Sequence, residues 1–359
     1  MSATQSVTIR RSLIFRLYLN ELIVALFFLV TFNSCNKPRE NSIPNLTPVT
    51  LGSLKTCKLI GNLGPSTMTI ANGYLITRWR YNDPFLSIFN LRSGKKIGEL
   101  GNDMKNPFLS GQSFKDSSTF FITDFGLNEH LTIKVRSDTI TQQSIRRSKL
   151  PYCFVGPMND VLKFDSSFYW GITRSTDENS RYFIFKTDRI HRVNNSSKVE
   201  IPVPSDDVPY YYYSYVSFND KQNRVAAALK YFNRVEFYDG NGELKSICTE
   251  NSTVEKLPPL NAISNPDAKL FYNWSYAGKK YFYASFVGES THDCYSNKGG
   301  MLIRAFSWDG QFVGEVKLDR MNLGSFAVNE STNELYIISF LPQDASSPLL
   351  IYDLANNFK

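Results

Sequence analysis

The sequence predicts an all-β fold, a six-bladed β-propeller with four-stranded blades, and three observations lead to this prediction. First, short apolar and aromatic runs alternate with Gly, Asn, Asp and Ser turns, whereas the 3.6-residue spacing of amphipathic helices is nearly absent. Second, this four-strand pattern recurs six times along the chain. Third, equivalent strands lie roughly 45–57 residues apart, which is typical of propeller blades. The 359 residues, 42% of them hydrophobic, provide enough apolar material for a sizeable core.

Each blade is expected from its own strands and turns. The first has strands over 67–70, 74–77, 86–91 and 96–100, with turns at Asn72-Gly73 and Ser93-Gly94. The second has strands over 112–114, 119–123, 131–135 and 139–145. The other units repeat the pattern: the fourth begins with strands over 215–218 and 224–229, and the fifth begins with a strand over 271–275 and turns at Asp309-Gly310. The expected blades are 66–101, 112–146, 160–201, 214–248, 271–318 and 323–354.

The last unit predicts how the ring closes. It lacks a fourth strand, and an unpaired strand-like segment, 53–60, precedes the first unit. Pairing this segment with 349–353 would remove two open sheet edges and complete a propeller over 51–355. The pattern leaves open a β-sandwich or two small β domains as the alternative.

The N-terminus has the features of an export signal. Arg10, Arg11 and Arg16 precede an apolar stretch over 22–32, which is short for a membrane-spanning helix. This stretch runs into Ser34-Cys35 and then into polar residues, and it resembles a bacterial lipoprotein signal. The resemblance implies a signal peptide over 1–34 and a lipid on the Cys35 thiol. An uncleaved membrane anchor with an incidental cysteine is the alternative.

A lipid on Cys35 predicts where the protein resides. Acyl chains anchor a protein stably, at about 0.8 kcal/mol per buried methylene. Asn36 is not the aspartate that marks retention in the inner membrane, so an outer-membrane lipoprotein of the cell envelope is expected, facing the periplasm or the exterior. Residues 35–50 contain Pro38, Pro44 and Pro48 among polar residues and are expected to form a flexible tether.

The lipoprotein-like start, the length and the six diverged units together resemble the TolB-like six-bladed β-propeller lipoproteins. The resemblance covers about residues 50–355 and rests on the blade pattern and on turns such as Gly64-Pro65 and Gly101-Asn102. It implies a binding scaffold and identifies no catalytic residues.

The residues themselves offer few candidates for catalysis or metal binding. The chain contains no Gly-x-Ser-x-Gly elbow, no Walker loop and no dinucleotide fingerprint. His292, Asp293 and Cys294 are adjacent, but neighbours on an extended chain point in opposite directions, so no metal site and no cofactor is expected. Basic residues are scattered among acidic ones despite the net charge of +7, so nucleic acid is not an expected partner.

Two function classes remain open. The first is a non-catalytic module that binds a protein, peptide or glycan, and the second is a propeller enzyme such as a lyase or hydrolase acting on an extracytoplasmic substrate. With three histidines, none of them on an expected innermost strand, the sequence favours binding. Four cysteines besides Cys35 would lie in an oxidising compartment, and Cys248 with Cys294 is the favoured disulfide pair.

Binding is expected on the face where the second strand of each blade ends, because loops on a rigid scaffold are free to recognise ligands. Arginine and tyrosine suit recognition surfaces, and the excess of basic residues there favours an anionic or carboxylate-bearing ligand. The alternative is that the aromatic residues pack between blades and the charges are only solvated. The candidate ligand-binding residues are Arg78, Trp79, Arg80, Asp124, Arg174, Tyr211, Tyr212, Lys230 and Tyr231.

Overall fold

The structure is a computed structural model, and contacts divide it into two units, Met1–Pro38 and Arg39–Lys359. It describes residues 38–57, 65–79, 86–100, 104, 107–124, 126–127, 129–135, 145–149, 161–163, 169–171, 185–187, 193–195, 213–240, 242–250, 269–296, 300–322, 324–338, 349–354 and 357–358. Apart from Pro38, all of these belong to the second unit, which is a β-propeller.

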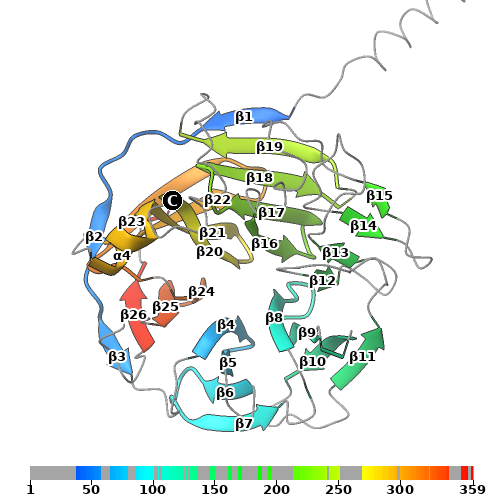
Figure 1. Cartoon of the computed structure of the whole chain (residues 1–359). Helices are drawn as coiled ribbons and strands as arrows, with labels where there is room; N and C mark the ends of the chain where they lie inside the picture. Colours follow the sequence, from blue (N-terminus) through cyan, green and yellow to red (C-terminus); the bar gives the residue numbers. More distant parts are fainter. Residues whose placement is uncertain are drawn as a thin grey trace, which may run out of the picture. The chain divides into compact units, whose positions relative to one another are not determined.

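The described strands form six sheets, shown in Figure 1. The first contains β4 (Pro65–Ala71), β5 (Tyr74–Trp79), β6 (Leu86–Asn90) and β7 (Lys96–Leu100). The second contains β8 (Pro107–Gln112), β9 (Thr119–Asp124), β10 (Glu129–Lys134) and β11 (Ile145–Lys149). The third contains β12 (Val161–Lys163), β13 (Tyr169–Gly171), β14 (Phe185–Thr187) and β15 (Val193–Asn195).

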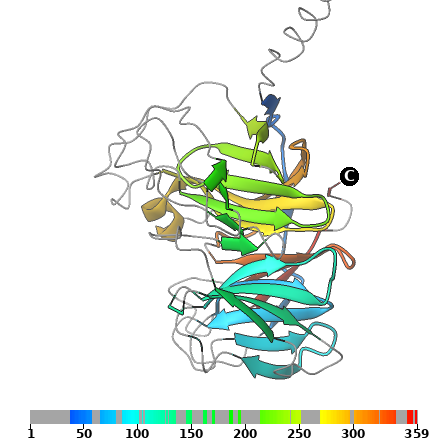
Figure 2. The ribbon, with the colours of Figure 1, turned by 90° about the vertical axis from the view of Figure 1, so that its right-hand side faces the viewer.

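The other three sheets follow in chain order. The fourth contains β16 (Ser214–Asn219), β17 (Arg224–Leu229), β18 (Arg234–Asp239) and β19 (Leu244–Thr249). The fifth contains β20 (Lys269–Ala277), β21 (Tyr281–Ser290), β22 (Leu302–Ser307) and β23 (Phe312–Leu318). The sixth contains β24 (Phe326–Asn329), β25 (Glu334–Ile338), β26 (Leu349–Asp353) and β3 (Lys55–Cys57). Figure 2 shows the same sheets edge-on.

The innermost strands of five sheets pack against one another in a closed order. Strand β4 contacts β8, β8 contacts β16, β16 contacts β20, β20 contacts β24, and β24 contacts β4. Strand β12 of the third sheet packs against β8 and β9. The all-β propeller prediction is therefore confirmed, but the ring made by these contacts has five blades where six were expected.

The direct contact between the second and fourth sheets explains this difference. Asp220 directly follows β16, and its carboxylate accepts hydrogen bonds from the Ser113 hydroxyl at 2.5 Å and from the Phe114 amide at 2.6 Å. The buried carboxylate thus ties the end of β16 to the turn after β8 without a residue of the third sheet between them. No periodicity in the sequence reveals this contact.

The strand boundaries of the second sheet also differ from the prediction. Residues 113–114 were expected to belong to a strand, yet β8 ends at Gln112 because the following residues turn to reach Asp220. The fourth strand of this sheet is Ile145–Lys149, later in the chain than the predicted 139–145.

The N-terminal strand completes the last sheet as predicted. Strand β3 pairs antiparallel with β26, and Leu349 lies opposite Cys57. The flexible tether predicted over 35–50 is wrong for residues 39–42 and 49–50, which form paired strands. Strand β1 (Arg39–Ser42) pairs parallel with β19, and β2 (Val49–Leu51) pairs parallel with β23. Residues 39–57 therefore follow the outer edges of three consecutive sheets, as Figure 1 shows, and we call this segment the N-terminal strap.

Backbone and side-chain contacts hold the strap in place. Ile43 is 4% exposed and packs in a core cluster with Cys248 and Trp308. Its amide donates to the Thr249 carbonyl at 2.9 Å, and the Asn41 side-chain amide donates to the Gly310 carbonyl at 2.8 Å. Pro44 and Pro48, which suggested a tether, lie between β1 and β2, so their missing amides interrupt no strand pairing.

The core lies between neighbouring sheets and is rich in aromatic residues. Between the fourth and fifth sheets, the ring centroid of Phe237 lies 5.8 Å from that of Phe282 and 6.1 Å from that of Phe306. Such contacts place apolar area from two sheets in one interface, so each sheet buries a face that it could not bury alone. Aromatic residues thus supply much of the apolar area buried between the fourth and fifth sheets.

Acid is expected to weaken the second sheet through Glu129. Its carboxylate lies 3.0 Å from the Lys149 ammonium and 3.1 Å from the Arg147 guanidinium. Hydrogen bonding to Lys149, with help from Arg147, lowers the pKa of Glu129 below its ordinary value of 4.5. A carboxylate whose pKa is depressed by folding stabilises the fold above its unfolded-state pKa, and this stabilisation is lost as the pH falls through the folded-state pKa.

Urea unfolding of wild type and Glu129→Gln at several pH values tests this expectation. The difference in unfolding free energy should be below about 1 kcal/mol at neutral pH, because Lys149 is exposed, and should vanish under strong acid. In the Arg147→Ala/Lys149→Ala double variant, the unfolding free energy should no longer fall with the protonation of Glu129, because both cations that lower the pKa of Glu129 are gone. A difference that grows as the pH falls contradicts the assignment.

Candidate functional site

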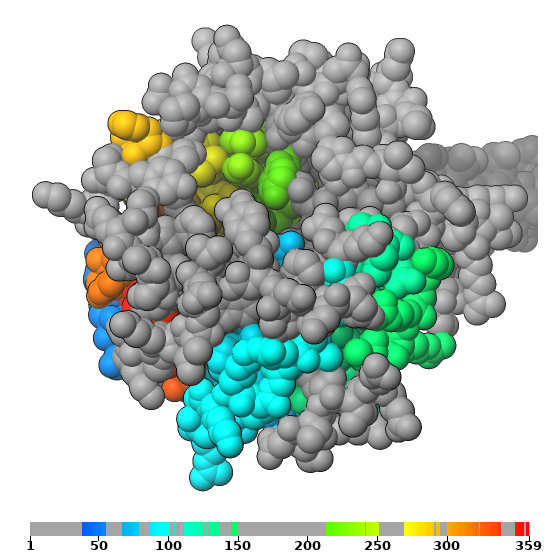
Figure 3. Space-filling view, turned by 60° about the horizontal axis from the view of Figure 1, so that its bottom comes forward, coloured from blue at the N-terminus to red at the C-terminus, as the bar shows by residue number. Residues whose placement is uncertain are grey.

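A pocket lies where the inner strands of four sheets meet. It is lined by residues of β4, β8, β16 and β20: Met68, Thr69, Leu109, Gly111, Gln112, Tyr215, Val216, Ser217, Phe218, Trp274, Ser275, Tyr276 and Ala277. The pocket was not predicted as the binding site, because the candidate residues were sought at strand ends. Figure 3 shows the described residues of the fourth sheet, in light green, beside those of the fifth, in yellow.

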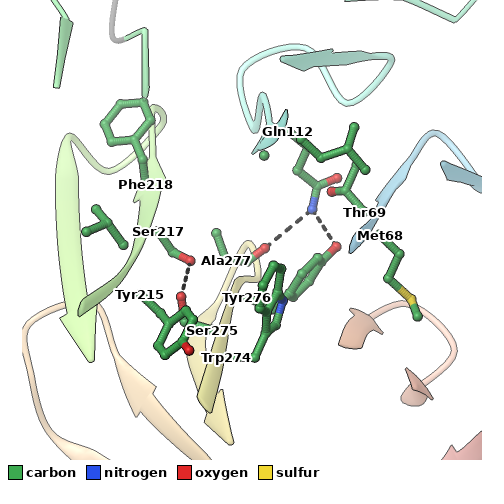
Figure 4. A pocket seen from close by; sticks show the side chains of 13 residues that line it. Met68, Thr69, Gln112, Tyr215, Ser217, Phe218, Trp274, Ser275, Tyr276 and Ala277 are labelled. Atoms are coloured by element: carbon green, nitrogen blue, oxygen red, sulfur yellow. Dashed lines mark hydrogen bonds between the residues drawn. The ribbon is translucent and has the colours of Figure 1, made fainter. Parts of the chain in front are cut away.

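Hydroxyl and amide groups form the polar part of the lining, as Figure 4 shows. The Gln112 side-chain amide donates to the Tyr276 hydroxyl at 2.9 Å and to the Ala277 carbonyl at 3.4 Å. The Ser217 and Ser275 hydroxyls are 2.9 Å apart. Burial raises the pKa of Tyr276 far above its ordinary value, so its hydroxyl remains protonated and can both donate and accept.

Aromatic rings form the other part of the lining and continue beyond it. The Tyr215 and Trp274 rings are 5.8 Å apart, and Tyr213, the residue before β16, places its ring edge-on to Tyr215 at 5.4 Å. All three side chains are partly exposed. Successive residues on a strand face opposite ways, so Tyr213 and Tyr215 are on the same side, and their rings meet for this reason.

Lys230 stands at the end of this row of rings. Its ammonium nitrogen lies 5.2 Å from the centroid of Tyr213 and 5.0 Å from that of Tyr231, within the range of cation–π contact. Its amide donates to the Tyr213 carbonyl at 2.7 Å, and its carbonyl accepts from the Phe271 amide at 2.8 Å. The backbone between β17 and β18 is thus fixed to both β16 and β20, and the side chain starts from a rigid position.

The electrostatic state of Lys230 follows from its surroundings. Burial lowers the pKa of Lys230 and raises that of Tyr231. None of the ion pairs among the described residues involves Lys230. The two tyrosine rings compensate only part of the lost hydration of the ammonium group, so an anion placed against it would gain a charge-assisted contact.

The size of the pocket restricts what can enter. It leaves about 50 Å³ for the centres of water-sized molecules, a few times the roughly 10–15 Å³ that one water requires. A group of a few heavy atoms therefore fits without rearrangement. The lining can hold such a group by ring contact and hydrogen bonding.

Hydrogen bonds to Glu330 fix the turn that follows the pocket residues of β20. The Glu330 carboxylate accepts from the Lys280 amide at 2.9 Å and from the Tyr281 amide at 3.1 Å. An added Cβ at Gly278 would be 2.3 Å from the Glu330 carboxylate oxygen and 2.8 Å from the Tyr281 carbonyl oxygen, so a side chain here would displace the backbone of the turn. The pocket is therefore supported by the sixth sheet as well as by the sheets that line it.

The structure brings together only part of the predicted ligand-binding set. Lys230 and Tyr231 are adjacent to Tyr213, and whether they bind a ligand stays a prediction. Arg78 is half-buried on β5, and Trp79 is the last residue of that strand. Arg80, Arg174, Tyr211 and Tyr212 lie outside the described residues, as does Cys35.

Asp124 is a correction to the predicted set. It is fully buried, and its carboxylate accepts from the amides of Gly126 at 2.9 Å and Leu127 at 3.1 Å. Both bonds go to Oδ1, so Asp124 caps the turn after its own strand. This buried capping role replaces the predicted ligand-binding role.

The predicted Cys248–Cys294 disulfide is wrong. Both thiols are free and buried, Cys248 on β19 and Cys294 on α4 (Thr291–Ser296). They belong to different core clusters, so the two sulfurs are turned into separate interfaces. Burial raises the pKa of Cys248 to about 12 and that of Cys294 to about 11, so both remain protonated thiols.

His292, Asp293 and Cys294 lie on helix α4 and not on the extended loop that was predicted. His292 and Asp293 are exposed, whereas Cys294 is turned into the core. Within the described ranges, no three His, Cys, Asp or Glu side chains come together as a metal site would require. In the same ranges, no helix is both long enough and apolar enough to cross a membrane.

Sequence reasoning missed Gln112, Tyr215, Trp274 and Tyr276. Tyr215 and Trp274 lie in segments that were correctly expected to be inner strands, so a search along these strands for polar and aromatic residues would have found them. Their proximity across three sheets has no signal in a single sequence, because it depends on which strands meet at the centre.

Comparison with known proteins supports the fold and no more. No family model and no curated protein matches the chain. Among solved structures, a member of the DUF4221 family from Bacteroides vulgatus is 14% identical, with a TM-score of 0.52, covering 85% of this chain and 98% of its own. An exported protein described as putative, from Bacteroides fragilis, is 10% identical, with a TM-score of 0.48, covering 88% and 99%. By its fold, this chain is similar to these proteins, and the first likeness agrees with the propeller architecture derived above.

Proposed function

We propose that the protein is a lipid-anchored, non-catalytic binding scaffold of the cell envelope that holds a ligand at the central pocket. The observation that carries the proposal is the lining itself: hydroxyls, an amide and aromatic rings from the inner strands of four sheets converge on one small space. Pockets of this composition bind by contact and hydrogen bonding.

The anchoring part of the proposal rests on the sequence around Cys35. Loss of the thiol removes the site of lipid attachment, so Cys35→Ala should move the protein from the membrane fraction to the soluble fraction and abolish incorporation of labelled palmitate. Membrane fractionation with metabolic labelling checks both. A Cys35→Ala protein that stays in the membrane fraction contradicts the lipoprotein assignment, and Cys294→Ala serves as the cysteine control.

The distance between the lipid attachment site and the N-terminal strap is short. Three residues separate Cys35 from Arg39, where β1 begins. At about 3.5 Å per residue, they span roughly 10–14 Å when extended. A lipid on Cys35 would therefore hold the outer edge of the fourth sheet near the membrane surface.

The binding part of the proposal is tested by capturing partners with the anchored protein. After cross-linking in intact cells, proteins and glycans that copurify with wild type should be depleted for the Tyr215→Ala/Trp274→Ala variant, because both rings that line the pocket are lost. Leu54→Ala, which truncates an apolar side chain that is 66% exposed on the strap, is the control. Thermal unfolding of each variant shows whether the fold is kept.

Two results contradict the proposal. One is a partner set that is unchanged in a folded double variant, which would place the binding site elsewhere. The other is the absence of any enriched molecule with wild type. A hydrolase or lyase would instead release a modified product from the captured material, and mass spectrometry of the eluate would detect it.

A further inference from the structure

We infer that the ligand of the central pocket is an acidic sugar, with its carboxylate against Lys230 and its ring against the aromatic row. This inference rests on the proposed function and names the chemistry of the ligand. Lys230, the aromatic row and the polar lining each match a different part of such a molecule: its carboxylate, one face of its ring and its hydroxyls.

Lys230 requires an anion. Its ammonium is half-buried and flanked by the Tyr213 and Tyr231 rings, which supply no formal negative charge. A carboxylate there would replace lost hydration with a charge-assisted hydrogen bond, which is roughly twice as strong as a neutral one. The lowered pKa of Lys230 is the expected property of such an uncompensated cation, and binding of an anion would raise it again.

The aromatic row requires a flat or weakly polar face. Tyr213, Tyr215 and Trp274 follow one another at ring separations of 5.4 and 5.8 Å, and Lys230 contacts the first of them. A pyranose ring carries C–H groups on one face, and these pack favourably against aromatic rings through dispersion. Tyr213 lies between Lys230 and Tyr215 of the pocket lining, so a ligand that contacts both Lys230 and the lining must extend along the Tyr213 ring.

The polar lining requires groups that both donate and accept. Ser217 and Ser275 present paired hydroxyls, and Gln112 presents its amide beside the Tyr276 hydroxyl. Sugar hydroxyls donate and accept in the same way. The small volume admits the edge of one sugar ring, so a terminal sugar of a chain fits better than an internal one.

The test uses the full chain in detergent, with glucuronate and glucose as probes, monitored by calorimetry and by NMR of the probe. Glucuronate should bind wild type, and glucose, which lacks the carboxylate, should bind about tenfold more weakly or not at all. Lys230→Met, which keeps an apolar stem, should weaken glucuronate binding by about tenfold or more, and Lys230→Arg should restore most of it. Lys279→Met, at an exposed lysine of the β20–β21 turn, should leave binding unchanged.

Several outcomes overturn the inference. These are failure of glucuronate to bind wild type, equal binding of glucose, and equal binding by Lys230→Met. A further one is binding of an acetylated dipeptide through its free carboxylate in place of glucuronate. If any of these occurs while pocket variants still lose partner capture, the scaffold proposal stands and only the ligand class is wrong. If capture is also independent of the pocket, both are wrong.

Discussion

Replacing Arg304 by alanine is expected to lower the free energy of unfolding by about 3–5 kcal/mol, the usual cost of breaking a buried ion pair from one side. The Arg304 side chain on β22 is 3% exposed, and the Glu315 side chain on β23 is 5% exposed. The Arg304 Nε donates to the Glu315 carboxylate at 3.0 Å. Without the guanidinium, Glu315 would keep a buried negative charge with no partner cation.

Arg304 also joins two sheets, which adds to the expected effect. Its Nη1 donates to the Tyr272 hydroxyl at 3.3 Å and to the Asn233 side-chain oxygen at 3.3 Å. Its Nη2 donates to the Glu250 carboxylate, and Asn233 donates to the other oxygen of that carboxylate at 2.7 Å. Asn233 directly precedes β18 and Glu250 directly follows β19 of the fourth sheet, whereas Tyr272 lies on β20 of the fifth, so one side chain satisfies polar groups on both sides of their interface.

Urea unfolding of the Arg304→Ala variant measures the effect, and three companion variants interpret it: Arg320→Ala, Glu315→Ala and Arg304→Ala/Glu315→Ala. Arg320→Ala removes an exposed pair in which the guanidinium lies 3.7 Å from Asp319, so its effect should stay within about 0.5 kcal/mol. In Arg304→Ala/Glu315→Ala both charges are gone, so the double variant should be more stable than the sum of the single losses predicts. Additive losses, or an Arg304→Ala loss below about 1 kcal/mol, contradict the assignment of a coupled buried pair.

The sequence predicts local elements of this fold well because they depend on neighbouring residues. Alternation and turn residues predicted β17 as Arg224–Leu229, which the structure has unchanged. The pairing of β3 with β26 was predictable because an unpaired strand and an incomplete last unit both leave open edges. The first inference uses only residues that are close in sequence, and the second uses the rule that exposed sheet edges are paired or covered.

Contacts between sheets could not be predicted in this way. Asp220 holding the turn after β8, and Tyr215 meeting Trp274, join residues that are more than fifty positions apart and follow no period. Composition even misled the interpretation of residues 39–50, where proline and polar residues suggested a tether. What orders this segment is the free edge of β19 and β23, and a single sequence does not show which edges are free.

Truncating Ile43 to alanine tests whether the N-terminal strap is an integral part of the propeller. Ile43 is 4% exposed among Cys248, Phe271 and Trp308, so the lost contacts and the cavity should lower the free energy of unfolding by about 2–5 kcal/mol.

Val49→Ala is the matched control, because Val49 lies on the same strap with 57% exposure and should change stability by less than about 0.5 kcal/mol. Hydrogen exchange separates two ways in which the strap could fail. If Ile43→Ala unfolds the whole propeller more readily, amides throughout β17 and β18 exchange faster. If the strap detaches alone, only the Ile43 amide and the partners of β1 on β19 lose protection, and urea unfolding of the remaining sheets is unchanged. The second result contradicts an integral strap. It would also expose the β19 edge for pairing with other chains, so the variant would then aggregate more readily than wild type.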